Sequence, residues 1–171
     1  MRFVRARASL AVFALASGAG LSSAMLAGCS RVEQAPAVSY TSLDGRRADL
    51  ASLRGHVVLV NFWATSCAPC VEEMPTMVAN WRRFSPQGFE TLAVSMAYDA
   101  PALVSNFAQS RALPFPVVID NTGEIAHRFG DVQFTPTSLL INKRGEIVRR
   151  WIGKTDFAAL APLIAQLDAE S

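Results

Sequence analysis

The chain has 171 residues, of which 51% are hydrophobic and 18% are charged. This length and composition fit one domain with a real apolar core, plus a tail or targeting segment. If Arg2, Arg5 and Arg7 leave with such a segment, 13 of the 16 basic residues remain against 14 acidic ones, and the net charge falls from +2 to −1. Without a basic excess, we predict no nucleic-acid partner.

The first 28 residues are typical of a secretory signal peptide. The three arginines form a positively charged start, and residues 8–27 are apolar and rich in small side chains. An apolar run of about 20 residues is just long enough to span a bilayer, so an uncleaved anchor is one alternative and plain secretion is another.

The apolar run ends in Leu-Ala-Gly-Cys at residues 26–29, which resembles the lipobox of bacterial lipoproteins. In those proteins the cysteine thiol is acylated and becomes the first residue. We therefore predict a signal peptide over 1–28, lipid attachment at Cys29 and a tether over 29–37, so that the protein is anchored in the bacterial periplasm. Lipid on Cys29 leaves Cys67 and Cys70 as one pair, with no stray thiol in an oxidising compartment.

Residues 38–171 are predicted to form the folded domain. A short strand is expected over 38–43, and Asp49 is expected to cap a helical turn after it. Residues 56–63 are a continuous apolar run rich in valine, which is typical of a strand buried on both faces. A helix is predicted over 68–84, because apolar residues recur there at spacings of three and four. Its core face consists of Met74, Met77, Val78, Trp81 and Phe84.

The rest of the domain continues the alternation of strands and helices. Strands are expected over 89–96, 114–119, 138–141 and 146–152. Helices are expected over 101–111, from a cap at Asn121 or Thr122 to Phe129, and from a cap at Thr155 or Asp156 to the end of the chain. The βαβ alternation predicts a parallel sheet, and the final hairpin adds an antiparallel pair, with helices on both faces.

Three motifs give the chain a family resemblance. Residues 60–70 read Val-Asn-Phe-Trp-Ala-Thr-Ser-Cys-Ala-Pro-Cys, residues 73–75 read Glu-Met-Pro, and residues 135–137 read Thr-Pro-Thr. A Cys-x-x-Cys that follows a buried strand and opens a helix, with a later Thr-Pro before a strand, resembles the periplasmic TlpA/ResA-like thiol–disulfide oxidoreductases. The resemblance covers residues 38–168. It implies an α/β thioredoxin fold, with a central mixed sheet flanked by helices on both faces and an inserted β–α unit.

The chemistry of Cys67 and Cys70 follows from their place at a helix N-terminus. Unpaired amide hydrogens and the helix dipole favour a thiolate at Cys67, and thiolate is the attacking species in thiol–disulfide exchange. We predict that Cys67 is the nucleophile and that Cys70, one turn further on, resolves the mixed disulfide. Glu72 and Glu73 suit a helix start but oppose a nearby thiolate, so their net effect stays open. No cofactor is expected besides this redox-active disulfide.

In the family, the proline that matches Pro136 forms a cis peptide bond beside the disulfide. The resemblance implies that Trp63, Thr135 and Pro136 belong to the substrate groove, where the Thr135 backbone would pair with an extended substrate strand. Pro136 also brings no amide hydrogen near the thiolate. The alternative is a trans proline in an ordinary loop.

The chain departs from the family pattern directly before Cys67 and in the strand that precedes it. Ser66 stands where many relatives carry tryptophan. Asn61 stands where cytoplasmic thioredoxins carry a buried aspartate that handles the proton of the second cysteine. ResA-like proteins use a carboxylate of the central insert instead, and Asp99 is the candidate proton acceptor here. We favour the other interpretation of Asp99, a cap for the helix that starts at Pro101.

The resulting hypothesis is a membrane-tethered periplasmic thiol–disulfide oxidoreductase that acts on protein thiols and disulfides. The resemblance implies reduction of disulfides in cytochrome c maturation or in copper-protein thiols, with electrons from a transmembrane donor of the DsbD/CcdA type. One alternative is a copper(I)-binding chaperone, with Met74 as the near third soft ligand. The other is a thiol peroxidase, because Thr65 precedes Cys67 in a peroxiredoxin-like way. His56 and His127 are isolated, so no metal site is predicted.

Overall fold

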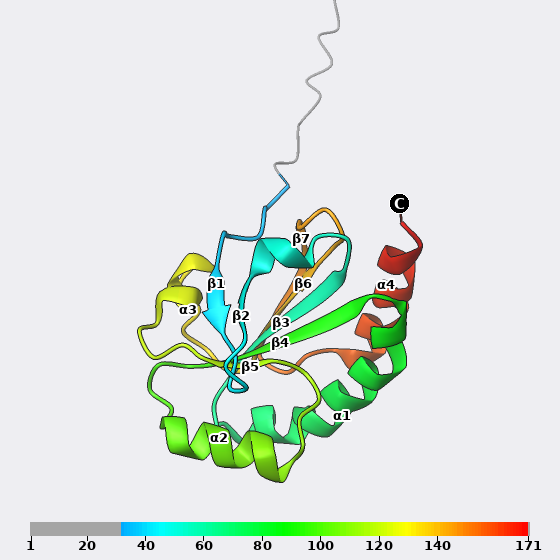
Figure 1. Cartoon of the computed structure of the whole chain (residues 1–171). Coiled ribbons are helices and arrows are strands. Elements are labelled where there is room, and N and C mark those ends of the chain that lie inside the picture. The colour runs from blue at the N-terminus through cyan, green and yellow to red at the C-terminus, as the bar shows by residue number, and fades with distance from the viewer. Residues whose placement is uncertain (1–31, 171) are drawn as a thin grey trace, which may run out of the picture. The chain divides into compact units, whose positions relative to one another are not determined.

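A five-stranded sheet organises the computed structural model, which describes residues 32–170 (Figure 1). The strand order is β5-β4-β3-β6-β7. The strands are β3 (Val57–Trp63), β4 (Phe89–Ser95), β5 (Val117–Ile119), β6 (Thr137–Ile141) and β7 (Ile147–Ile152). β3, β4 and β5 run parallel, whereas β6 pairs antiparallel with both β3 and β7. The predicted mixed sheet is therefore confirmed.

Helices cover both faces of this sheet, as predicted. They are α1 (Ala68–Phe84), α2 (Pro101–Ser110), α3 (Glu124–Arg128) and α4 (Phe157–Ala169), with short 3-10 turns η1 (Leu50–Leu53) and η2 (Ser85–Gln87). Side chains of α1, α2 and α4 share one apolar core, and those of α3 share the other. Figure 1 shows α1 and α4 on one side of the sheet and α3 on the opposite side.

β3 is buried along its whole length because it lies in the middle of the sheet between the two cores. Val57, Leu59 and Trp63 point into the core of α1 and α4, whereas Val58 and Phe62 point into the core of α3. This alternation is the period of two expected of a strand. The end of β3 leads directly into the Cys67 loop and α1, so the cysteines follow a strand that is buried along its whole length.

The predicted helix over 68–84 coincides with α1. Met74, Met77 and Phe84 are buried, and Val78 and Trp81 pack against the same core. A proline occupies the first turn, where amide hydrogens lack helical partners in any case. The packing of this apolar face fixes the direction in which the helix N-terminus points.

The segment predicted as a tether contacts the domain. The carbonyl of Glu33 accepts a hydrogen bond from Ile147, and the N–H of Ala35 donates to Gly145. β7 is the last strand of the sheet, so its outer edge offers backbone groups that need partners. Residues 33–35 of the predicted tether therefore pair with the edge of the sheet. The predicted signal peptide and Cys29 lie outside the described residues, and between 32 and 170 no helix combines the length and apolarity needed to cross a bilayer.

Two local predictions also need correction. The strand expected over 38–43 is half of a hairpin, in which β1 (Ser39–Thr41) pairs with β2 (Arg47–Asp49), and strands of three residues are too short for a clear alternation. The Asp49 carboxylate does not cap η1 but accepts a hydrogen bond from Ser39. By contrast, Asp156 caps α4 as predicted, accepting from the N–H of Ala159 at 3.0 Å.

Candidate redox site

Cys67 and Cys70 form a disulfide at the N-terminus of α1, with their Cα atoms 5.2 Å apart. Cys67 is the N-cap residue of the helix, and its sulfur accepts a hydrogen bond from the backbone N–H of Cys70 at 3.3 Å. In the reduced form the same donor and the helix dipole stabilise a thiolate at Cys67. Cys67 is half-buried, whereas only 2% of Cys70 is exposed, which confirms the predicted difference in access.

Pro136 lies at the same edge of the sheet as the cysteines. Thr137 at the start of β6 pairs with Phe62 near the end of β3, so the antiparallel register brings Pro136 beside the point where the chain turns toward Cys67. The Thr135–Pro136 peptide bond is cis. The carbonyl of Pro136 accepts a hydrogen bond from Gly153 at 2.8 Å. The tertiary structure thus brings together two loops that are far apart in the sequence.

Trp63 is not part of an open groove. Its side chain has no exposed surface, and its ring packs on Phe107 of α2 with the ring centroids 5.1 Å apart. The strand alternation directs this residue into the core, so its prediction as a substrate-groove residue is wrong. Trp63 belongs instead to the apolar core that contains Cys70 and against which Cys67 packs.

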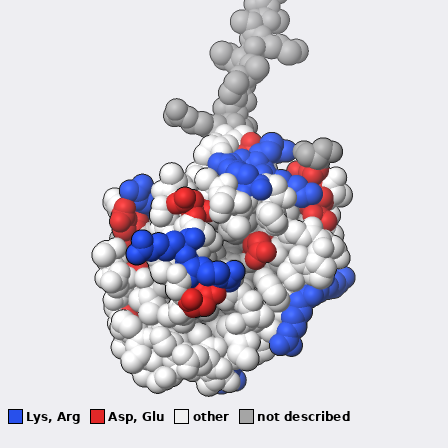
Figure 2. Space-filling model, in the orientation of Figure 1, with Lys and Arg blue, Asp and Glu red and all other residues white. Residues whose placement is uncertain are grey.

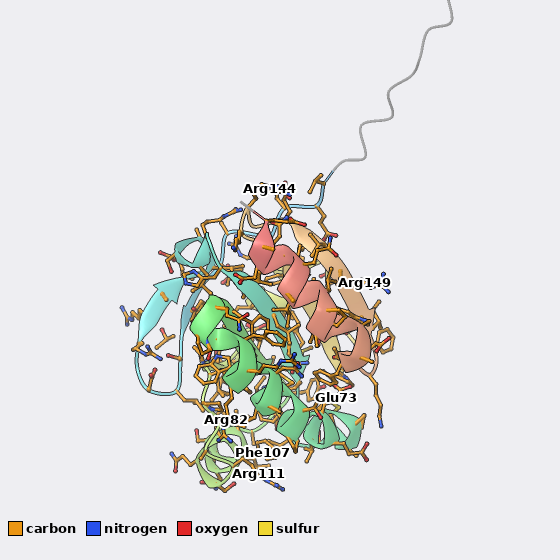
Figure 3. The ribbon with its side chains drawn as sticks, turned by 90° about the vertical axis from the view of Figure 1, so that its right-hand side faces the viewer. Glu73, Arg82, Phe107, Arg111, Arg144 and Arg149 are labelled. Atoms are coloured by element: carbon orange, nitrogen blue, oxygen red, sulfur yellow. A yellow bond between two sulfur atoms is a disulfide. The ribbon has the colours of Figure 1, made fainter. Side chains whose placement is uncertain are left out.

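Glu73 is a buried carboxylate on the helix of the cysteines, with 6% of its surface exposed. It accepts hydrogen bonds from the backbone N–H of Thr155 at 2.6 Å and from the Thr155 hydroxyl at 3.4 Å. Burial raises the pKa of Glu73, and the hydrogen bonds from Thr155 and the charge of Lys154 partly oppose that rise. Figure 3 shows Glu73 near the lower end of α1, close to the start of α4.

A chain of polar side chains leads from Glu73 into the core. The Thr155 hydroxyl lies 2.9 Å from that of Ser138, which accepts a hydrogen bond from the Asn61 amide at 2.9 Å. All the donors in this chain can point toward Glu73. Asn61, the residue at the position of the buried aspartate of thioredoxins, is therefore connected to a carboxylate that α1 supplies.

In the sequence, Glu73 belongs to the Glu-Met-Pro motif and lies near the start of the helix, but neither feature led us to predict this role. A usable signal was present, because Glu73 follows Cys70 by three residues and side chains at that spacing share a helix face. An acidic residue among Cys70, Met74 and Met77 on the core face of α1 is also exceptional, since unpaired carboxylates are rarely buried.

Asp99 holds the loop before the cysteines. It is 6% exposed, and its two oxygens accept hydrogen bonds from the N–H and the hydroxyl of Thr65, both at 2.6 Å. The N-cap residue of α2 is Ala100, and no side chain caps that helix. The favoured interpretation of Asp99 as a helix cap is therefore wrong. The structure places it beside the cysteine loop, where the competing interpretation also expected it.

The surface at this end of the molecule carries few charges. α2 contains no charged residue, and the lower end of the face in Figure 2, where Figure 1 places α2, is almost entirely uncharged. Tyr98 and Phe134, which adjoin Asp99 and Thr135 in the sequence, are exposed, and Ser66 is exposed beside Cys67. Over residues 32–170, no group of three or more His, Cys, Asp or Glu side chains is arranged to hold a metal ion.

Comparison with known proteins decides the family. Residues 32–150 match the model of the AhpC/TSA family. The thiol–disulfide oxidoreductase ResA of Bacillus subtilis is 34% identical over 143 residues, which cover 82% of this chain and 79% of the relative. ResA of Bacillus thuringiensis subsp. konkukian is 36% identical over 122 residues, which cover 71% and 69%. The chain belongs to the ResA-like thiol–disulfide oxidoreductases of the AhpC/TSA family.

Solved structures agree with this membership. The solution structure of a thioredoxin from Neisseria meningitidis has a TM-score of 0.75 and 36% identity, covering 81% of this chain and 93% of that one. A thiol:disulfide interchange protein from Chlorobium tepidum has a TM-score of 0.74 and 27% identity, covering 81% and 98%. The predicted thioredoxin fold is confirmed, and the ResA-like chain is a thioredoxin-like oxidoreductase with the Cys67–Cys70 pair as its disulfide.

Proposed function

We propose that this oxidoreductase reduces disulfides of other proteins in the periplasm, while lipid on Cys29 holds it to the membrane. The observation that carries the proposal is the Cys67–Cys70 disulfide at the N-terminus of α1, with the buried carboxylate of Glu73 one turn further along the same helix. This arrangement combines an accessible sulfur, a donor that stabilises its thiolate and a proton acceptor near the second sulfur.

The reaction starts from the reduced form. The Cys67 thiolate attacks one sulfur of a substrate disulfide, a Cys67–substrate bond forms, and the substrate disulfide breaks with release of a thiolate. Cys70 then gives its proton to ionised Glu73 and attacks the Cys67 sulfur. The Cys67–Cys70 bond forms, the second substrate thiolate leaves, and two electrons have passed from the protein to the substrate. An external dithiol returns the pair to its reduced form.

The raised pKa of Glu73 suits this role. An ordinary glutamate is a weak base toward a thiol, and catalytic acids and bases work best when their pKa lies near the working pH. Burial moves the pKa of Glu73 in that direction, while the hydrogen bonds from Thr155 keep its carboxylate in one place. Asp99 was the candidate proton acceptor in the sequence, but its carboxyl group binds Thr65, before the cysteines, whereas Glu73 is buried with Cys70 on the same helix. We therefore assign the proton to Glu73.

For the substrates we propose disulfides that arise in cytochrome c maturation or in copper-protein thiols, with a transmembrane electron donor of the DsbD/CcdA type. The support is the ResA-like sequence, together with the position of Thr135 and Pro136 beside the disulfide, where an extended cysteine-bearing segment can lie along the Thr135 backbone. In this proposal the uncharged surface around α2 faces the substrate.

Trapping tests the proposal directly. In cells that express Cys70→Ser, the mixed disulfide with a substrate cannot be resolved, so we expect covalent complexes that dithiothreitol releases and that contain periplasmic cysteine proteins. A Cys67→Ser, Cys70→Ser double variant is the matched control and should form none. A trapping variant that gives no more complexes than the double variant, although the wild-type protein reduces insulin, would refute the proposed protein substrates.

A further inference from the structure

Two adjacent residues after β4 each hold one of the loops of the redox site. Asp99 accepts two hydrogen bonds of 2.6 Å from Thr65, which lies two residues before Cys67. The hydroxyl of Tyr98 lies 3.2 Å from that of Thr135, which immediately precedes Pro136. The segment between β4 and α2 therefore contacts both the cysteine loop and the proline loop.

This segment is itself anchored to the sheet. The N–H of Met96 donates to the carbonyl of Trp63 at 3.0 Å, and the N–H of Asp99 donates to the carbonyl of Met96 at 3.0 Å. Because Asp99 is almost fully buried, water competes weakly for its hydrogen bonds, and releasing Thr65 would leave a charged group without partners. The contact with Thr65 is consequently the firm half of the connection, and the exposed contact of Tyr98 is the weaker half.

We infer that Tyr98 and Asp99 form a brace that sets the position of Cys67 relative to Pro136. They are positioning residues: Asp99 acts through Thr65, and Tyr98 acts through Thr135. Exchange needs the attacking sulfur in line with the substrate disulfide, and a misplacement of about 1 Å can cost about 10²-fold in rate. A peptide that lies along Thr135 has its disulfide positioned by the proline loop. Its reaction with Cys67 therefore requires that the cysteine loop and the proline loop are correctly placed relative to each other. A small disulfide reaches Cys67 without the proline loop.

The inference rests on the proposed exchange at Cys67 and makes a distinct prediction about substrate size. Purified full-length protein, reduced beforehand, is assayed with a disulfide-bonded peptide and with the small disulfide 5,5′-dithiobis(2-nitrobenzoate). We expect Tyr98→Phe to lower kcat/KM for the peptide about threefold to tenfold, the scale of one lost hydrogen bond, and to leave the rate with the small disulfide within about twofold. Equal losses with both substrates would overturn the brace. Wild-type protein inactive on both would instead refute the proposed exchange.

A double-mutant cycle tests whether the two contacts act together. Thr65→Val removes the hydroxyl that Asp99 binds, and Thr76→Val on the exposed side of α1 is the matched control. Effects of separate, independent sites multiply. Because the brace works only when both ends hold, we expect Thr65→Val combined with Tyr98→Phe to be about as slow with the peptide as the slower single variant. Multiplicative losses, or a loss from Thr76→Val equal to that from Thr65→Val, would overturn the inference.

Asp99→Asn separates positioning from proton transfer. Asparagine can accept the hydrogen bond from the N–H of Thr65 and donate to its hydroxyl, so the geometry is preserved while the carboxylate is lost. We expect Asp99→Asn to retain at least about half of the peptide kcat/KM with an unchanged pH profile, and Asp99→Ala to lose about tenfold. A shifted pH profile in Asp99→Asn, or a loss as large as that of Asp99→Ala, would show a proton-transfer role and overturn positioning.

Discussion

The carboxylate of Glu73 and the backbone N–H of Thr155 are 2.6 Å apart, although 82 positions separate the two residues in the sequence. This hydrogen bond ties the first turns of α1 to the loop that precedes α4. The same loop binds the carbonyl of Pro136 through Gly153. The carboxylate, the cysteine helix and the proline loop are thus held by one short segment, residues 153–155.

Removal of either cysteine should separate the two chemical steps. Cys67→Ser should lower exchange with a protein disulfide by about 10³-fold or more, because the attacking group is lost. Cys70→Ser should still react with one substrate molecule, since Cys67 remains accessible, and then stop as a mixed disulfide. Stopped-flow measurement and mass spectrometry of the product distinguish the two. Equal behaviour of the two variants would contradict the assigned roles.

Glu73→Gln should slow resolution of the mixed disulfide while leaving the first attack nearly unchanged. Removal of a proton acceptor typically costs about 10²-fold or more, so the intermediate should accumulate in single-turnover experiments. The pH at which resolution becomes fast should no longer follow the raised pKa of this group. Glu72→Gln is the matched control, because Glu72 is exposed and pairs with Lys154 at 2.7 Å. An identical effect of both substitutions would point to a general loss of negative charge.

The raised pKa of Glu73 should also make the free energy of unfolding depend on pH. Because its folded-state pKa is raised, the folded protein binds this proton more tightly than the unfolded chain does, so the free energy of unfolding decreases as pH rises from the ordinary value of 4.5 through the raised one. Glu73→Gln removes this contribution. The stability difference between Glu73→Gln and wild type should therefore shift in favour of the variant as pH rises across that window, measured by urea unfolding. A difference that does not change with pH would refute the raised pKa.

Asp44 should behave in the opposite way at low pH. Its hydrogen bonds with Ser42 and Arg46 lower its pKa to about 2, so its contribution to stability is present above the ordinary pKa of 3.8 and is lost as pH falls toward 2. Asp44→Asn should consequently weaken the stability difference between neutral and acidic pH. Because Asp44 is exposed, we expect a small effect, within the range of surface ion pairs. Thermal unfolding across this pH range measures it, with Asp131→Asn as an exposed control.

Cys29→Ala should release the protein from membranes. A lipid on this cysteine is the proposed anchor, so its loss leaves the domain without a hydrophobic attachment. Fractionation of cells that express the wild-type and variant chains measures the change, and globomycin, which blocks lipoprotein signal peptidase, should affect only the wild type. Retention of Cys29→Ala in the membrane pellet would favour an uncleaved anchor over residues 1–28.

Local periodicity was sufficient to predict most of the fold. The apolar run over 56–63 corresponds to β3, and the spacing of three and four over 68–84 corresponds to α1. Both elements bury nearly continuous apolar surfaces, which leave a clear pattern of apolar residues in the sequence. The β1–β2 hairpin and the pairing of residues 33–35 with the start of β7 were not predictable in this way. Each consists of a few residues whose conformation depends on a distant strand edge.

For the redox site, the sequence alone was enough to identify Cys67 and Cys70, because these cysteines lie three positions apart and the N-terminus of one helix acts on both of them. The partners of Glu73 and Asp99 were decided only by the tertiary structure. The properties of a buried carboxylate depend on the hydrogen-bond donors around it. Thr155 donates to Glu73 and Thr65 donates to Asp99, and each donor is far from its carboxylate in the sequence, so no local pattern predicts the pair.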